Sequence, residues 1–453
     1  MSTIITEIAN NFIKNILEIF NEGGSLTEIE PKMLSESKKC AAEMFEKYAE
    51  EVDTAIACDK VARKKAGFTV ERRNDERKVQ TLVGEVCFNR TYYKKASGGY
   101  EYLTDTILGI DRRERVSEGL SLSLASAATD MSYWKATKHI TDGLISRQTV
   151  MSRVRRGEAV VSVPSEKNRV PELHIDADEA HVTLLNGIKS EVPLISVYEG
   201  IETQGKRNKC REVFHISEYG KKPDDLWEQA LNEIEARYDL TDTKIYLHGD
   251  GANWIKTGLE WIPNAIFVLD KYHKNKAIKA MTAGLSKEDR KDFDKEIRWA
   301  LENEEIDFFN GLTNSLCEEN PERERKILTN ARYLKNFISG ISICKTDFRA
   351  NNGGCTEPHV SHVLSARLSS RPMAWSKKTL KKLAPVLAAG NISFSKREKN
   401  KIIELPASIR KATNRAKKAF NSHIKGLPSP DSIGVLPISG KITGTQILLK
   451  SYL

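Results

Sequence analysis

The order of strand-like and helical stretches from Glu172 to Asp270 limits the fold of this 453-residue chain more than any other feature. Three strand-like stretches rich in β-branched and aromatic residues come first: ELHIDADEAHVTLL, VPLISVYEG and CREVFHISEYG. They are followed by a helical pattern (DDLWEQALNEIEARY), a short strand (KIYLHGD), a short helix (NWIKTGLEWI) and a last strand (NAIFVLD). This order predicts a mixed sheet in an α/β domain.

Helical patterns flank this alternating region on both sides. Between two helical stretches before it, residues 68–102 are rich in β-branched and aromatic residues and contain a turn at Ser97–Gly99, which predicts a β-hairpin. After Asp270 the pattern is helical again. We therefore expect four regions: N-terminal helices (1–68), a β-hairpin with a helix-turn-helix (69–165), an α/β domain (170–375) with an all-helical insertion at about 274–350, and a basic C-terminal region (376–453).

The predicted helix-turn-helix lies between Val116 and Arg156. Ser132 and Ser146 are suitable N-caps, and Gly143 suits the turn between the second and third helices. A basic helix after such a turn is typical of DNA recognition, although helix pairs with a basic face also occur in proteins that never bind DNA. The residues predicted to contact DNA here are Arg147, Gln148, Arg153, Arg155 and Arg156.

Composition excludes several classes of protein. Hydrophobic residues make up 40% and charged residues 29%, which is ordinary for a folded chain and too apolar for a disordered one. Seven cysteines without a Cys-x-x-Cys pair argue against a disulfide framework and a zinc ribbon. Without a run of about 18 apolar residues or a basic leader, the sequence predicts a cytoplasmic protein.

The formal net charge of +9 is a weak indication of a nucleic-acid partner. Its distribution is more informative, because residues 376–425 contain 14 Lys and Arg against two acidic residues. A solvated basic tail is the alternative interpretation.

Four acidic residues stand where strands end or a helix begins: Asp176, Asp178, Asp250 and Glu357. Asp176 and Asp178 are two apart on one strand and so share a face. Carboxylates gathered at one sheet edge repel one another unless cations neutralise them, and such oxygen ligands suit Mg²⁺ or Mn²⁺. Two such ions can promote in-line phosphodiester displacement, so we expect two ions and phosphoryl transfer on DNA. The alternative is that each is a solvent-facing carboxylate.

Four ordered motifs carry a resemblance that covers most of the chain: IDADEAHV, LHGDGANWI, DKYHKNKAI and GGCTEPHVSHVLSARLSSRPMAW. Together they resemble the ISLre-type insertion-sequence transposases, prokaryotic relatives of the Mutator-like DDE transposases. The resemblance implies an RNase H-like catalytic domain that an all-helical insertion interrupts before the last acidic residue.

The resemblance also implies the site residues. The catalytic, metal-binding triad falls on Asp178, Asp250 and Glu357, with Asp176 as the alternative first aspartate. The Asp-x-x-His signature falls on Asp270 and His273, which are expected to support the site. Pro358 departs from the family, where a small residue usually follows the glutamate, but proline is well tolerated in the first turn of a helix.

The implied activity is that of a DNA transposase. It would bind double-stranded DNA at the terminal inverted repeats of its element, cut the ends with Mg²⁺ (or Mn²⁺) and transfer them to target DNA. The resemblance further implies a homodimer or larger synaptic assembly acting at the nucleoid of a prokaryotic cell. Next to the site, further residues are expected to meet DNA phosphates: Arg367, Arg371, Lys377 and Lys378.

Three alternatives remain open at this stage. A metal-dependent nuclease with an RNase H-like fold would use the same acids without strand transfer, and a domesticated, non-catalytic regulator would only bind DNA. A zinc site at His359 and His362, with His174 or His181, is disfavoured because oxygen ligands dominate and no cysteine lies at ligand spacing.

Overall fold

The protein is described by a computed structural model that covers residues 2–205 and 207–394. The described residues divide into two compact units, one that runs to Leu120 and one that starts at Ser121. The division falls inside the predicted 69–165 region, so the hairpin and the helix-turn-helix belong to different units. Most of the predicted basic C-terminal region, residues 395–453, lies outside the described residues. In the part of the chain that the structure describes, no helix is both long and apolar enough to cross a bilayer.

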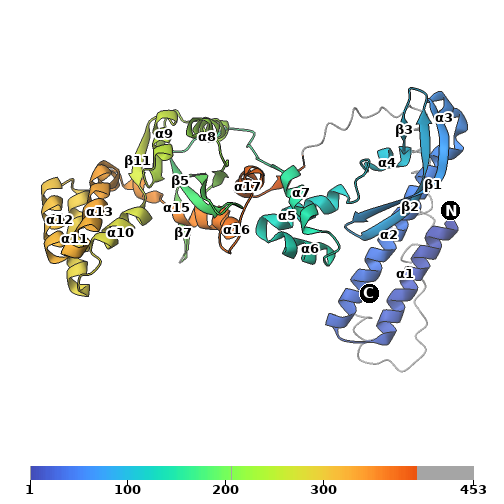
Figure 1. The fold of residues 1–453 in the computed structure, drawn as a ribbon, viewed down its shortest axis with the longest axis horizontal. Coiled ribbons are helices and arrows are strands. Elements are labelled where there is room, and N and C mark those ends of the chain that lie inside the picture. Colours follow the sequence, from blue (N-terminus) through green and yellow to red (C-terminus); the bar gives the residue numbers. More distant parts are fainter. Residues whose placement is uncertain (1, 206, 395–453) are drawn as a thin grey trace. The chain divides into compact units, whose positions relative to one another are not determined.

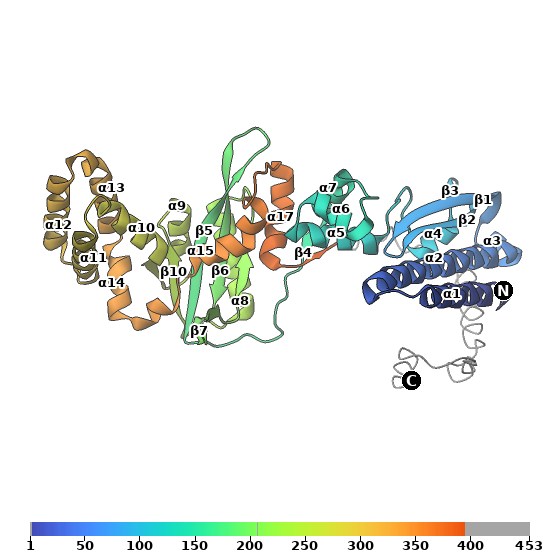
Figure 2. The ribbon, with the colours of Figure 1, turned by 90° about the horizontal axis from the view of Figure 1, so that it is seen from below.

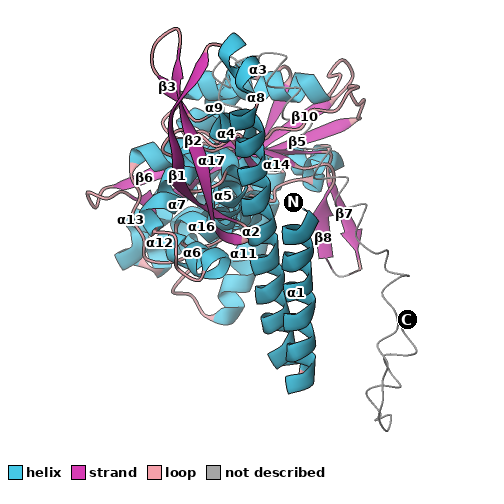
Figure 3. Ribbon diagram, turned by 90° about the vertical axis from the view of Figure 1, so that its right-hand side faces the viewer, coloured by secondary structure: helices cyan, strands magenta, loops and turns pink. Residues whose placement is uncertain are grey.

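The first unit packs a three-stranded sheet against a long helical hairpin. Figure 3 shows α1 and α2 lying side by side, and α2 packs against β2 through Val52, Ile56 and Tyr93. The elements are α1 (Ser2–Glu22), α2 (Leu26–Cys58), α3 (Lys60–Lys65), β1 (Phe68–Thr81), β2 (Gly84–Lys95), β3 (Tyr100–Glu101) and α4 (Leu103–Leu108). The helical N-terminus and the following strands agree with the sequence pattern.

The tight turn of the β1–β2 hairpin lies earlier than the sequence indicated. Thr81 pairs with Gly84 across the turn, whereas the predicted turn at Ser97–Gly99 joins β2 to the short β3. The Thr81 hydroxyl donates to the Gly84 carbonyl and accepts from the Val83 N–H. Gly84 has φ of +116°, which glycine tolerates without strain. Because Leu82 and Val83 read as strand residues, the pattern hid this turn.

The second unit contains the predicted helix-turn-helix, α5 (Glu118–Asp130, which begins in the first unit), α6 (Tyr133–Thr141) and α7 (Arg147–Arg156). Both predicted N-caps are confirmed, because Ser132 accepts from Lys135 N and Ser146 accepts from Thr149 N. Gly143 follows α6 with φ of +87° and donates its N–H to Thr137 O, the long bond of a helix C-cap. Two short strands, β4 (Glu158–Ala159) and β12 (Ile392–Ser393), pair antiparallel next to α17 (Lys377–Ala389).

The main sheet has the order β11-β10-β5-β6-β9. Its strands are β5 (Glu172–Thr183), β6 (Lys189–Tyr198), β9 (Phe214–Ile216), β10 (Lys244–Gly249) and β11 (Ala265–Leu269). β6 is antiparallel to β5 and β9, whereas β10 is parallel to β5 and β11. The mixed α/β class is thereby confirmed. Between β6 and β9, β7 (Ile201–Gln204) and β8 (Arg207–Cys210) form an extra hairpin.

The two faces of the sheet have different chemistry. On one face, α8 (Pro223–Arg237) and α9 (Asn253–Trp261) cover Leu173, Ile175 and Ala177 of β5 around the fully buried Trp227. The other face carries His174, Asp176 and Asp178, because residues two apart on a strand share a face. The sheet therefore separates an apolar core from a polar side that can hold a site.

A helical block follows β11 and has its own core. It comprises α10 (Lys271–Met281), α11 (Lys287–Glu302), α12 (Ile306–Glu319), the 3₁₀ turn Pro321–Arg323, α13 (Glu324–Asn336) and α14 (Ile338–Thr346). Figure 2 shows these helices together beyond β10. Ser286 is the N-cap of α11 and accepts from Asp289 N, and Pro321 opens the 3₁₀ turn before α13. The chain then returns through η2 (Phe348–Asn352), α15 (Thr356–His359), the π-helix η3 (Val360–Ser365) and α16 (Ala366–Leu368).

Candidate active site

Two of the predicted acids, Asp178 and Asp250, lie on neighbouring parallel strands. The register pairs His248 of β10 with Asp176 of β5. Two residues further along, Asp178 and Asp250 occupy equivalent positions, with Asp250 directly after the last residue of β10. Asp178 is 9% exposed, so its carboxylate is held in the protein and not in bulk water.

The two carboxylates interact electrostatically. The pKa of Asp178 is raised to about 6: burial is the main cause and the charges of Glu179 and Asp250 add to it, while the Glu179 N–H and His273 act in the opposite direction. The pKa of Glu179 is also raised, mainly by burial and in addition by the charge of Asp250. Each of the two predicted acids uses one oxygen for a nearby backbone N–H, that of Glu179 for Asp178 and that of Ala252 for Asp250. A cation would relieve the remaining repulsion.

This repulsion has a consequence for the stability of the metal-free protein. The pKa of Asp178 is raised above its ordinary value of 3.8, so ionisation costs folding free energy as the pH rises from about 4 to about 6, and the full cost is present above that window. We expect Asp178→Asn to increase the free energy of unfolding by about 2 kcal/mol at pH 7. Urea denaturation in EDTA measures this, and the gain should fade towards pH 4.

Glu191→Gln is the control for this prediction, because Glu191 lies on the adjacent strand β6 with its side chain 62% exposed. It should leave the free energy of unfolding within about 0.5 kcal/mol of the wild type at both pH values. If Asp178→Asn were no more stable than this control at pH 7, the carboxylate would not be under electrostatic strain.

Asp270 and His273 form an ion pair beside these carboxylates. Asp270 is the N-cap of α10 and accepts from the N–H groups of Tyr272 and His273, and its Oδ2 lies 3.2 Å from His273 Nδ1. Burial alone would raise the pKa of Asp270, but the hydrogen bonds from His273 and Thr356 outweigh it and the net pKa is lowered. The hydrogen bond to Asp270 raises the pKa of His273, and Asp178 and Asp250 raise it further. The raised pKa favours the protonated form of His273 next to the two acids.

Thr356 connects this group to the segment that contains Glu357. The Thr356 hydroxyl donates to Asp270 Oδ1 over 2.9 Å, so the first turn of α15 lies against the end of β11. Glu357 is the next residue and its side chain is exposed. Within residues 2–205 and 207–394, no three His, Cys, Asp or Glu side chains are arranged closely enough to hold a metal ion. Asp178 and Asp250 thus interact, and among the described residues Glu357 does not complete a three-residue metal site with them.

Asp176 belongs to a different network. It is 2% exposed and accepts from the Tyr198 hydroxyl and from the Cys355 N–H, and its Oδ2 lies 3.2 Å from His359 Nδ1. These contacts connect the glycine-rich loop before α15 to the centre of the sheet. With two donors and the His359 ring around it, Asp176 is better suited to positioning that loop than to holding a metal.

The loop approaches the sheet so closely that only glycine fits at one position. A Cβ at Gly353 would lie 2.3 Å from His174 Nδ1 and 2.4 Å from His248 Nε2. These two nitrogens are themselves 3.0 Å apart. Burial lowers the pKa of both histidines, in the case of His174 to about 3, so they form a neutral imidazole pair.

The members of the alternative zinc set are dispersed. His174 is in the imidazole pair, His359 contacts Asp176, and His181 and His362 are exposed. Sequence reasoning missed the positioning roles of Tyr198, Thr356 and Cys355. The paired glycines before Cys355 were the one available signal, because they indicated a close approach of the backbone.

The basic residues expected to contact DNA fall into two groups. Arg155 donates to the hydroxyls of Ser376 and Thr379, and so connects α7 to α17. Arg367 is 6% exposed, donates to Ala128 O and lies over the Trp375 ring. Arg153 and Arg156 are half-buried, and the Arg156 guanidinium lies 4.3 Å from the centre of the Phe394 ring. The exposed residues are Arg147, Gln148, Arg371, Lys377 and Lys378.

Fold and site together define a mixed α/β protein with a carboxylate pair at the junction of two parallel strands and a helical block inserted before the last acidic motif. The model of the uncharacterised protein family UPF0236 matches residues 19–403, and the chain belongs to this family.

Relatives match along nearly the whole chain. The UPF0236 protein TTE2489 of Caldanaerobacter subterraneus subsp. tengcongensis is 35% identical over 473 residues, which cover 100% of this chain and 98% of the relative. Another protein of that organism, whose name joins eleven designations from TTE0033 to TTE2212, is 35% identical over 99% of this chain and 97% of its own length. A Streptococcus gallolyticus protein, named UPF0236 protein in vanSb 3'region, is 23% identical over 85% of this chain and 86% of its own.

Proposed function

We propose that the protein is a DNA transposase of the DDE type. The observation that carries the proposal is the pair Asp178 and Asp250 at equivalent positions of β5 and β10, with the pKa of Asp178 raised to about 6 by burial and by neighbouring acids. A buried carboxylate whose pKa is strongly raised, beside a second acid, is more typical of a catalytic centre than of a solvated surface. The position of each acid in its ordered motif supports the same assignment.

The strand order supports an RNase H-like catalytic domain. Three antiparallel strands (β5, β6 and β9) are followed by two strands parallel to β5 on its other side, and a helix precedes each of these two. A helical block then intervenes before α15, which begins with Thr356 and Glu357. In this proposal the acids come from the first strand, the fourth strand and the helix after the insertion.

Asp178, Asp250 and Glu357 are the proposed metal ligands, with Asp176 the alternative to Asp178. Their oxygen donors fit Mg²⁺ or Mn²⁺, and the repulsion around Asp178 is what a bound cation would relieve. Two bound ions would activate water or a 3′-hydroxyl and stabilise the leaving oxygen in an in-line displacement.

The chain's own residues then have defined tasks. Asp270 orients His273 and, through Thr356, fixes the start of the helix that carries Glu357. Asp176 fixes the loop before that helix through Cys355. For Glu357 to join the other two acids, its exposed side chain must turn towards them when DNA and metal bind.

DNA is the proposed partner. The exposed residues Arg147 and Gln148 begin α7 and are proposed to contact bases of the terminal repeats. Arg371, Lys377 and Lys378 are proposed to contact backbone phosphates. Joining two ends requires both in one complex, so we propose a dimer or larger assembly that acts on the chromosome in the cytoplasm. The relative whose name joins eleven designations supports mobility, since dispersed copies in one organism are what transposition produces.

A transposition assay in cells tests the proposal. The gene with its native flanking DNA and a selectable marker is placed on a plasmid, and marker transfer to a second replicon is scored and sequenced. Transposition predicts new junctions that share the same element ends. Nicked or broken plasmid without junctions would favour a nuclease with the same acids. DNA binding without either product, unaffected by Asp250→Ala, would favour a non-catalytic regulator.

A further inference from the structure

A pocket in the first unit is lined almost entirely by arginine. Its volume is about 410 Å³, and it lies between the β1–β2 ribbon, α4 and the loop that follows α4. Five guanidinium groups and one carboxylate line it, together with a tyrosine: Arg77, Arg90, Arg112, Arg113, Arg115, Asp105 and Tyr102. This pocket has no part in the proposed catalytic site.

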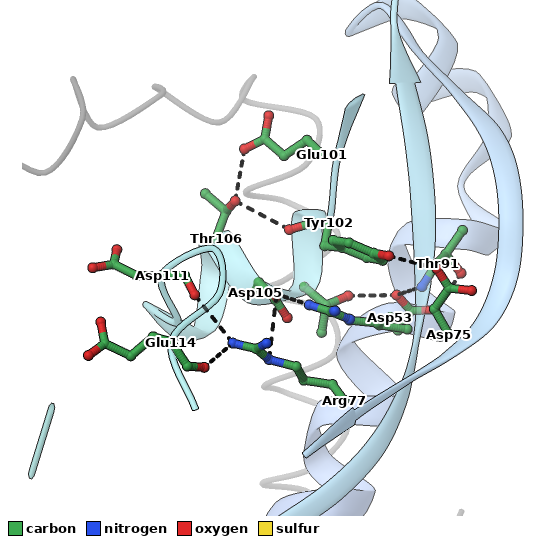
Figure 4. A network of polar contacts seen from close by, with 12 residues as sticks. Asp53, Asp75, Arg77, Thr91, Glu101, Tyr102, Asp105, Thr106, Asp111 and Glu114 are labelled. Atoms are coloured by element: carbon green, nitrogen blue, oxygen red, sulfur yellow. Dashed lines mark hydrogen bonds and ion pairs between the residues drawn. The ribbon is translucent and has the colours of Figure 1, made fainter. Parts of the chain in front are cut away.

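The single carboxylate of the pocket, that of Asp105, already contacts the two inner arginines, Arg77 and Arg90. Arg90 Nη1 is paired with Asp105 Oδ2, and Arg77 Nε lies 4.0 Å from the same oxygen. Figure 4 shows Arg77 and Asp105 turned towards each other. The side chains of both arginines and of Asp105 are largely buried, and Arg90 also lies 3.5 Å over the Tyr102 ring. Asp105 therefore cannot neutralise the rest of the pocket.

The three outer arginines of the pocket are exposed and form no ion pair with a carboxylate in the described part of the chain. They are Arg112, Arg113 and Arg115. The uncompensated charge affects the inner pair. Burial lowers the pKa of Arg77, and the nearby charge of Arg115 lowers it further. Burial lowers the pKa of Arg90 to about 10, and Arg77 contributes in the same direction. The Nε atoms of Arg77 and Arg90 are buried without a hydrogen-bond partner among the described residues.

The backbone holds the outer arginines in place. Gln80 of β1 donates to Arg115 O and accepts from Ser117 N, which fixes the loop against the ribbon. Arg77 Nη2 donates to the carbonyls of Asp111 and Glu114 in the same loop. Arg113 has φ of +70°, a conformation that costs a non-glycine residue about 1 kcal/mol. A fixed loop with a strained arginine is more typical of a binding site than of a solvated surface.

We propose that this pocket is a phosphate-binding site. Arginine matches the paired oxygens of a phosphate with two parallel N–H donors, and several converging arginines suit a dianion. The phosphate can belong to a DNA backbone or to a small molecule. The DNA source rests on the proposed function, whereas the phosphate chemistry does not.

The test replaces two exposed arginines of the rim. The double variant Arg112→Gln with Arg115→Gln removes two charges and leaves the contacts of Arg77 and Arg90 with Asp105 in place. Arg72→Gln is the matched control, since Arg72 lies on the same ribbon, is exposed and is already paired with Asp75. Affinity of the full chain for a labelled duplex is measured at several NaCl concentrations, and thermal unfolding is measured in phosphate and in chloride at equal ionic strength.

A backbone phosphate in the pocket predicts weaker duplex binding by the double variant, with the slope of log affinity against log salt reduced by about 2. It also predicts that inorganic phosphate raises the unfolding temperature of the wild type and of Arg72→Gln, but not of the double variant. Phosphate stabilisation lost in the double variant, with unchanged duplex binding, would support the site and exclude DNA as its source. Loss of neither property would overturn the proposal. These results do not depend on whether the protein cuts or joins DNA.

Discussion

Replacement of either carboxylate at the β5–β10 junction by its amide is expected to abolish DNA cleavage and joining. Asp178→Asn and Asp250→Asn preserve the shape of the side chain and remove its charge, so a metal ion loses a ligand. Metal ions contribute several kcal/mol to such displacements, and 1.4 kcal/mol is a factor of ten in rate. We expect the rate of end cleavage to fall about a thousandfold or more. Cleavage of a labelled element end in Mg²⁺, followed on a denaturing gel, measures this.

Two comparisons make that result specific. Glu191→Gln, an exposed acid on β6, should keep the wild-type rate, and circular dichroism should show that all variants are folded. Wild-type rates in both Asp178→Asn and Asp250→Asn would contradict the assigned site. If Asp176→Asn were folded and inactive while Asp178→Asn was active, the first carboxylate of the triad would be Asp176.

The largest expected effect on stability is that of Trp227→Ala in α8. Trp227 is fully buried among the residues of the sheet and of α9, and its Nε1 donates to Trp254 O over 2.6 Å. Gly258 of α9 lies against its ring, and a Cβ there would come within 2.6 Å of Trp227 Cζ2. Removal of such a side chain leaves a cavity between sheet and helices. We expect the free energy of unfolding to fall by about 4 kcal/mol, as measured by urea denaturation.

Trp299→Ala is the matched control for this change. Trp299 is a tryptophan of α11 that is 51% exposed, so its replacement should cost less than about 1 kcal/mol. Equal losses in the two variants would contradict the packing of α8 and α9 against one face of the sheet.

The sheet and the helices around it could be predicted because local pattern and tertiary structure agree there. Ile175 and Ala177 of β5 alternate with Asp176 and Asp178, and the alternation separates the apolar face from the polar one. The N-caps Ser132, Ser146 and Ser286 were equally local signals, since each accepts from an N–H three residues later. Features of this kind need no knowledge of distant contacts.

Other features depend on contacts between distant parts of the chain and could not be predicted. The buried position of Arg367 results from Ala128 and Trp375, and that of Asp176 from Tyr198 and Cys355. In the sequence, Arg367 has the appearance of a phosphate contact and Asp176 that of an alternative first aspartate of the triad. The arginine pocket likewise brings residues of β1, β2 and the loop after α4 together, although they are spread over 39 positions from Arg77 to Arg115.

We propose that this chain cuts and joins DNA at metal ions held by Asp178, Asp250 and Glu357. The most direct test is a joining reaction with the purified full chain, a duplex of the DNA that flanks its gene, and a supercoiled target plasmid. We expect covalent junctions between the 3′ end of the duplex and the plasmid in Mg²⁺ or Mn²⁺, none in EDTA, and none with Asp250→Asn. Junctions that form equally well with Asp250→Asn, or no junctions with the wild-type protein in either metal, would contradict it.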